Sequence, residues 1–193
     1  WPGGKTMSRA LKGDAGPRNR LRPWIWGAAV GLLLVPAIAM RFFPAAGVDW
    51  TALDFVAMGV LLALACGLYE LGARASANAV YRLAFALAVL TGFLTVWVNL
   101  AVGMLGGEHD AINLGFAGVL LVAAAGATIA RLEPAGMARA MAVAGVAQLL
   151  VVGVAVPMGV RPVELALTAC FAVPWFASAL LFGAAARRVV ARR

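Results

Sequence analysis

The chain has 193 residues, of which 64% are hydrophobic and 12% are charged. Soluble domains contain roughly 45–50% apolar and about 25% charged residues, so this composition excludes an ordinary soluble protein and a disordered chain. Two cysteines are too few for a disulfide-stapled fold. The net charge is +8, and the basic residues behind it lie between apolar runs and at the two ends of the chain. This distribution is typical of membrane topology rather than of nucleic-acid binding. The sequence therefore predicts a polytopic membrane protein with no nucleic-acid partner.

The chain begins with a basic segment that is rich in Gly, Pro and Arg. We expect residues 1–22 to form a flexible cytoplasmic arm that contacts anionic lipid headgroups. Residues 23–187 are expected to form a transmembrane domain, and residues 188–193 a basic cytoplasmic tail.

Six apolar stretches follow the arm, each close to the 17–25 residues or so that a helix needs to cross a bilayer. They run over Trp24–Met40, Thr51–Ala73, Tyr81–Leu105, Asn113–Ala130, Met137–Gly159 and Pro162–Ala186. Long continuous runs favour helices over the alternating strands of a membrane barrel. The predicted fold is an all-α transmembrane bundle of six spans. Because every connection is short, consecutive helices are expected to pack as antiparallel neighbours.

The Lys and Arg residues predict the orientation of these spans. A cytoplasmic N-terminus places 14 of them inside and only Arg41 and Arg161 outside, so both termini are expected in the cytoplasm. An alternative is a secretory signal that ends at Ala37-Ile38-Ala39. Its apolar run of about 17 residues is longer than most signal cores, so we expect the first span to stay uncleaved.

Several residues within the spans carry structural expectations. Gly27 and Gly31 have the spacing that lets helices approach closely, and we expect them to pack inside the bundle rather than in a dimer. Pro36 and Pro174 should kink their helices. Glu70 precedes Arg74 by four residues, which predicts an interfacial ion pair. The functional alternative for Glu70 is a proton or cation relay.

Small and polar residues recur every three or four positions in the third span. The polar ones are Thr91, Thr95 and Asn99, and Gln148 of the fifth span could face them. Such a stripe either packs helices together, which we expect here, or lines a polar cavity. A candidate polar pathway leads from Gln148 past Asn99 to an acidic outer mouth.

The predicted outer loops hold most of the acids. Three of them stand near helix starts: Asp54 in a Thr51-x-x-Asp54 capping box, Asp110 in an Asp110-x-x-Asn113 pattern that could cap its helix similarly, and Glu164. Glu108, His109 and Asp110 offer oxygen and nitrogen ligands to a divalent metal, but Asp54 or Glu164 would have to join them. We expect solvated loop charges here rather than a bound metal, and a contact with a substrate or partner is the remaining alternative.

Few ionisable residues lie within the predicted spans, and this limits the catalytic and cofactor chemistry that the spans can support. The single His is in a loop, and both Lys are in the arm, so an intramembrane haem with two His ligands and a retinal Schiff base are not supported. No Ser–His–Asp set fits within the spans. We therefore expect no cofactor and no enzymatic activity.

Three stretches are similar to a group of small bacterial multi-pass inner-membrane proteins: RPWIWGAAVGLLLVPAIAMRF, MGVLLALACGLYELGAR and VNLAVGMLGGEHDAINLGF. The resemblance covers most of residues 22–131 and implies a bacterial inner-membrane location, but it supplies no activity. We hypothesise a structural, accessory or assembly role, with a membrane-protein partner or a second copy of the chain. The alternative is a small transporter or channel for a cation or polar solute, and a membrane enzyme comes last.

Overall fold

The computed structural model describes residues 22–107 and 110–190, and all regular structure in these ranges is helical. The α-helices are α1 (Arg22–Phe42), α2 (Ala52–Ala75), α3 (Ala79–Ala101), α4 (Leu114–Ile129), α5 (Pro134–Ala155), α6 (Pro162–Cys170) and α7 (Ala172–Val190). Short 3-10 turns are η2 (Pro44–Ala46), η3 (Ala111–Asn113) and η4 (Val156–Met158). With α6 and α7 taken as one, six helices are long and apolar enough to cross a membrane, which confirms the predicted all-α class.

Local sequence signals explain where the helices begin. Thr51 and Asp54 form the predicted capping box: the Asp54 carboxylate accepts from the Thr51 backbone N–H at 2.7 Å. Asn78 caps α3 by accepting from the Val80 N–H at 2.9 Å. Pro134 and Pro162 occupy first helical positions, where the missing N–H costs no hydrogen bond.

The third and sixth spans depart from the prediction at a glycine and a proline. The third helix ends at Ala101 rather than at Leu105, because Gly103 takes the left-handed conformation (φ 70°) and starts a loop. The sixth span breaks between α6 and α7. Pro174 has no N–H for the carbonyl of Cys170, four residues earlier, so the predicted kink takes the form of a helix end. In contrast, α1 continues as a helix through Pro36.

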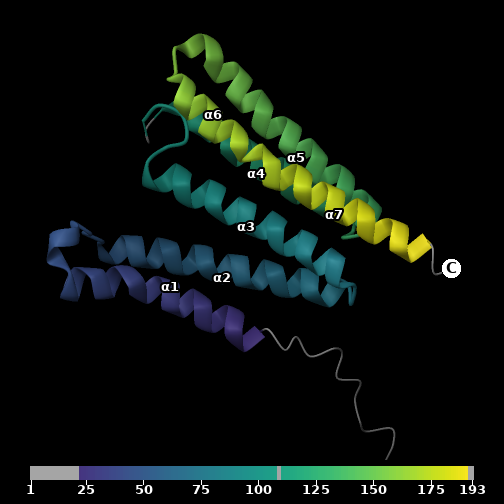
Figure 1. The fold of residues 1–193 in the computed structure, drawn as a ribbon, viewed down its shortest axis with the longest axis horizontal. Coiled ribbons are helices and arrows are strands. Elements are labelled where there is room, and N and C mark those ends of the chain that lie inside the picture. The colour runs from purple at the N-terminus through teal and green to yellow at the C-terminus, as the bar shows by residue number, and fades with distance from the viewer. Residues whose placement is uncertain (1–21, 108–109, 191–193) are drawn as a thin grey trace, which may run out of the picture.

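The helices do not all pack in chain order. α7 makes extensive contacts with both α3 and α5, and α4 packs on α5, while α3 and α4 contact each other little. The expectation that consecutive helices are neighbours is therefore wrong for α3 and α4. The α1–α2 hairpin joins the rest mainly through α3, and Figure 1 shows it on the side of α3 that faces away from α5 and α7.

Close helix contacts occur at glycines other than the predicted pair. A Cβ on Gly126 would lie 2.7 Å from the Ala140 Cβ, and one on Gly72 would lie 2.3 Å from the Phe85 ring. By contrast, a Cβ on Gly27 or Gly31 would meet no described atom within 4 Å. The prediction that Gly27 and Gly31 pack inside the bundle is wrong, because the face of α1 that carries them points away from α2.

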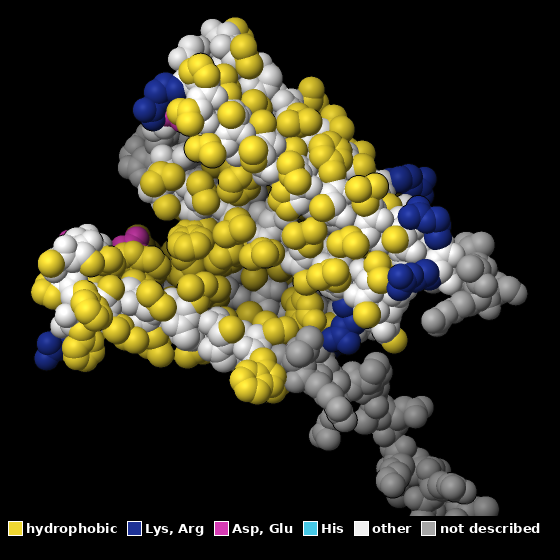
Figure 2. All heavy atoms as spheres, viewed as in Figure 1, with side chains coloured by type: hydrophobic (Ala, Val, Ile, Leu, Met, Phe, Trp, Pro, Cys, Tyr) yellow, Lys and Arg dark blue, Asp and Glu magenta, His cyan; other side chains and the backbone are white. Residues whose placement is uncertain are grey.

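Charged residues gather at the two ends of the helices. The basic end carries Arg74, Arg82, Arg131, Arg139, Arg187 and Arg188. Figure 2 shows dark blue side chains clustered there, and Figure 1 shows that α1 begins and α7 ends at this same end. The opposite, acidic end carries Asp49, Asp54, Asp110 and Glu164 together with Arg41 and Arg161. Between the ends the surface is largely hydrophobic.

Candidate functional site

The predicted polar stripe of α3 is buried and satisfies part of its hydrogen bonding within its own helix. Thr91 and Thr95 are 2% and 0% exposed. The Thr91 hydroxyl donates to the Leu87 carbonyl at 2.7 Å, and the Thr95 hydroxyl donates to the Thr91 carbonyl at 2.8 Å. This is the usual solution for threonine inside an apolar helix. Neither hydroxyl proton is therefore directed at a cavity.

Asn113 organises the loop that follows α3. Its Oδ1 accepts from the N–H groups of Met104 and Leu105, both at 3.1 Å. Its Nδ2 donates to the carbonyls of Leu105 and Gly107 at 3.2 and 2.7 Å. Asn99 reaches the same point, since its Nδ2 donates to the Asn113 carbonyl at 3.2 Å. The sequence pattern predicted Asn113 only as the start of a helix, and its bonds to the loop were missed. The one signal for this role is its position between a Gly-rich loop and an apolar helix.

Gln148 bonds to α6 rather than to Asn99. It is fully buried, and its Nε2 donates to the Thr168 carbonyl at 3.1 Å. The Thr168 hydroxyl in turn donates to the Met104 carbonyl at 2.7 Å. This chain connects α5, α6 and the loop after α3. The side-chain oxygens of Asn99 and Gln148 are buried without a donor among the described residues.

The acids of the acidic end serve separate structural purposes. Asp54 belongs to the capping box of α2. Glu164 accepts from the Gly106 N–H at 3.1 Å and pairs with Arg161. Asp110 accepts from the Gly107 N–H at 2.6 Å and makes no side-chain cap, so the expected Asp110–Asn113 cap is wrong.

The candidate metal ligands do not form a described cluster. Glu108 and His109 lie outside the described residues, and Asp110 turns to Gly107. Within residues 22–107 and 110–190, no three His, Cys, Asp or Glu side chains lie close enough to hold a metal ion.

A pocket opens beside Glu164, which we call the acidic-end pocket. It has a volume of about 270 Å³ and lies between the end of α3, the following loop and α6. Val98, Met104, Glu164, Thr168 and Phe171 are among its lining residues. Polar and apolar groups therefore meet in one concavity, as in sites for small polar ligands.

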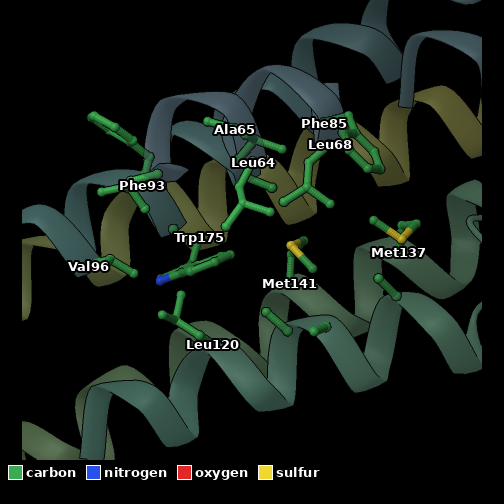
Figure 3. A pocket seen from close by; sticks show the side chains of 17 residues that line it. Leu64, Ala65, Leu68, Phe85, Phe93, Val96, Leu120, Met137, Met141 and Trp175 are labelled. Atoms are coloured by element: carbon green, nitrogen blue, oxygen red, sulfur yellow. The ribbon is translucent and has the colours of Figure 1, made fainter. Parts of the chain in front are cut away.

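A second, apolar pocket was not anticipated from the sequence. We call it the lateral cleft; its volume is about 320 Å³, and it lies between α2 and α3 on one side and α4 and α5 on the other. Figure 3 shows Leu64 and Leu68 pointing across it toward Trp175, Met141 and Leu120. Trp175 comes from α7, is 2% exposed, and its indole N–H has no acceptor among the described residues. The sequence of an apolar helix does not indicate whether a cleft separates it from its neighbours.

Glu70 ties α1 to α2 at the basic end. Its carboxylate accepts from the Trp26 indole N–H at 2.7 Å. It also pairs with Arg22 at 2.9 Å and with Arg74 at 3.2 Å. The predicted Glu70–Arg74 ion pair is confirmed, and the two α1 partners were missed because residues 44 or more positions apart share no local pattern.

Comparisons with known proteins assign no family. No family model, curated protein or solved structure matches the chain.

Proposed function

We propose that the chain is a multi-pass protein of the bacterial inner membrane with both termini in the cytoplasm, and that it serves as an accessory or assembly component of a membrane complex. Six helices of sufficient length and the basic residues gathered at one end support the membrane placement. The sequence resemblance over residues 22–131 supports the bacterial inner membrane.

The outward face of α1 is the observation that carries the accessory role. Pro36 is the one residue of α1 that the described part of the chain buries. Gly27 and Gly31 lie on an exposed face with no described atom packed against them. In a bilayer, helices associate through small residues that let backbones approach. This face suits a transmembrane helix of another membrane protein.

Site-specific photo-crosslinking in intact membranes tests this association. A benzoyl-phenylalanine placed at Leu34, an exposed position of α1, should yield one discrete protein adduct. The double variant Gly27→Leu/Gly31→Leu should weaken that adduct about tenfold, which corresponds to about 1.4 kcal/mol. The matched control Gly118→Leu/Gly153→Leu changes exposed glycines of α4 and α5 with equal free space and should leave it unchanged. Lipid adducts alone would contradict the proposal. An adduct of twice the chain mass would show that α1 contacts a second copy of the chain rather than another protein, which would also contradict the accessory role.

Transport of a cation or small polar solute is the second candidate, and the acidic-end pocket favours it. The pocket reaches Thr168 close to the break in the sixth span, and discontinuous helices line midplane sites in transporters. The unpartnered oxygens of Asn99 and Gln148 could accept from a cationic solute. Liposomes containing the protein would be tested for uptake of sodium, potassium and methylammonium. Flux that is lost in Asn99→Ala/Gln148→Ala would establish transport, and flux equal to that of protein-free liposomes would reject it.

A further inference from the structure

We infer that the lateral cleft is a binding site for one acyl chain of an anionic phospholipid whose headgroup lies at the basic end. The inference shares the membrane placement of the proposed function, but it concerns a different face and a different class of ligand. Loss of the α1 cross-link would therefore reject the accessory role without affecting the lipid site, and absence of bound lipid would reject the lipid site alone.

The walls of the cleft leave it open to an apolar chain. α3 and α4 contact each other little, and small residues of α3 and α4 keep the space between them free: Ala88, Gly92, Ala123, Ala124 and Ala127. Trp175 forms the floor from α7. With no chain inside, the lining side chains would lose dispersion contacts on their open side. A flexible hydrocarbon chain restores those contacts.

The rim of the cleft faces lipid rather than a described part of the protein. Leu64 and Leu68 line it from α2 and are 59% and 49% exposed. Leu121 of α4, one residue beyond the lining Leu120, is 70% exposed. In a bilayer these side chains are in contact with acyl chains, so the cleft continues the lipid phase into the protein.

Charge at one end of the cleft selects the headgroup. Ala127 lines the cleft on α4, and Arg131 follows four residues later in the turn before α5. Arg131 is exposed, and its turn is held by the Tyr81 hydroxyl, which donates to the Leu132 carbonyl at 2.7 Å. Glu133 is the one acid of this turn, whereas the basic end as a whole is rich in arginine. Juxtamembrane arginines attract anionic lipids, so a phosphatidylglycerol-type headgroup fits better than a zwitterionic one.

Native mass spectrometry of the full chain in detergent tests the assignment. The probes are phosphatidylglycerol and phosphatidylcholine with the same oleoyl chains. The wild type should retain one phosphatidylglycerol preferentially. Ala124→Phe fills the cleft from an exposed position and should weaken retention about tenfold, because about two displaced methylene groups suffice for that change. Ala125→Phe is the matched control, since Ala125 is exposed on the same helix but does not line the cleft.

A second pair of variants separates the headgroup from the chain. Arg131→Gln should abolish the preference for phosphatidylglycerol, whereas Arg188→Gln removes an exposed charge of the same end on α7 and should preserve it. Equal retention of the two lipids by the wild type, or equal losses in Ala124→Phe and Ala125→Phe, would overturn the inference. A protein dimer in place of a bound lipid would overturn it as well.

A fluorescence measurement keeps the inference testable if a variant is unstable in detergent. With the other tryptophans changed to Phe, Trp175 should be quenched by lipids brominated in mid-chain, because the floor of the cleft would touch the chain. Ala124→Phe should remove that quenching in bilayers, and Ala125→Phe should retain it. Unquenched Trp175 in the parent protein would contradict an acyl chain in the cleft.

Discussion

The α1–α2 hairpin and the α3–α7 part of the molecule are made of similarly apolar helices, yet they bury their side chains to very different extents. α5 buries eight residues, among them Met137, Met141 and the fully buried Gln148. α1 buries Pro36 alone among the described contacts. Apolar composition therefore decides that a helix can enter a membrane, but its contacts with the other helices decide how much of it is buried in protein.

The two regions also differ in where their helices are hydrogen-bonded. In the α3–α7 part the bonds occur along the helices: the Ser178 hydroxyl donates to the Ala84 carbonyl at 2.8 Å, and Tyr81 and Thr168 reach other segments. In the hairpin, α1 and α2 are joined by polar contacts at the basic end, through Glu70. Mutations should thus lower global stability in the α3–α7 part and change only local geometry in the hairpin.

The largest expected effect is that of Gly126→Leu in the α4–α5 contact. The new Cβ would lie 2.7 Å from the Ala140 Cβ and 3.2 Å from its Cα, so backbone must move. We expect the free energy of unfolding to fall by about 3 kcal/mol, measured by reversible unfolding in mixed micelles. Gly118→Leu, on the same helix with no atom within 4 Å, is the control. Equal stabilities of the two variants would contradict the tight contact.

Asn113→Ala should have the next largest effect. It leaves the buried N–H groups of Met104 and Leu105 without their acceptor, which costs about 2 kcal/mol. Hydrogen exchange of these two amides should accelerate, while amides of α1 and α2 keep their rates. Unchanged protection of Leu105 would show that the loop does not depend on Asn113.

Tyr81→Phe should cost about 1 kcal/mol, because it removes one buried hydroxyl and keeps the ring. The ring packs edge-on against Phe182, with centroids 5.1 Å apart, and this contact survives the change. The melting temperature in detergent measures the loss. Tyr69→Phe removes a hydroxyl from α2 that has no hydrogen-bond partner among the described residues. This variant should leave the melting temperature unchanged. A wild-type melting temperature for Tyr81→Phe would argue against the Leu132 anchor.

The smallest global effect is expected for Glu70→Gln. Loss of the carboxylate weakens the contacts to Trp26, Arg22 and Arg74 at the basic end of the hairpin. Both arginines are exposed, and ion pairs with exposed partners contribute little to stability. The distribution of distances between spin labels on α1 and α2 should broaden, while the melting temperature stays unchanged. A large fall in melting temperature would show that the hairpin supports the rest of the fold.

Much of the secondary structure could be predicted because its causes are local. The Thr51–Asp54 box was predicted, and Pro174 was predicted to kink the span that it interrupts. Both effects depend on residues within one helical turn, as do the prolines at the starts of α5 and α6. The individual residues of the candidate sites were partly foreseen, but their partners were not. Gln148 was expected near Asn99, but it bonds to Thr168 of α6. Because α7 packs between α3 and α5, the preceding α6 lies next to Gln148.

The sequence by itself determined six helical segments long and apolar enough for a membrane and the separation of basic from acidic loops, since both follow from composition along the chain. Only the tertiary structure decided that Gly27 and Gly31 face outward, that Asn113 binds the loop after α3, and that a cleft opens above Trp175. The physical reason is that, outside the polar stripe of α3, these helices are apolar on every side. Periodicity then cannot indicate which face packs, and close contacts between distant segments make the choice.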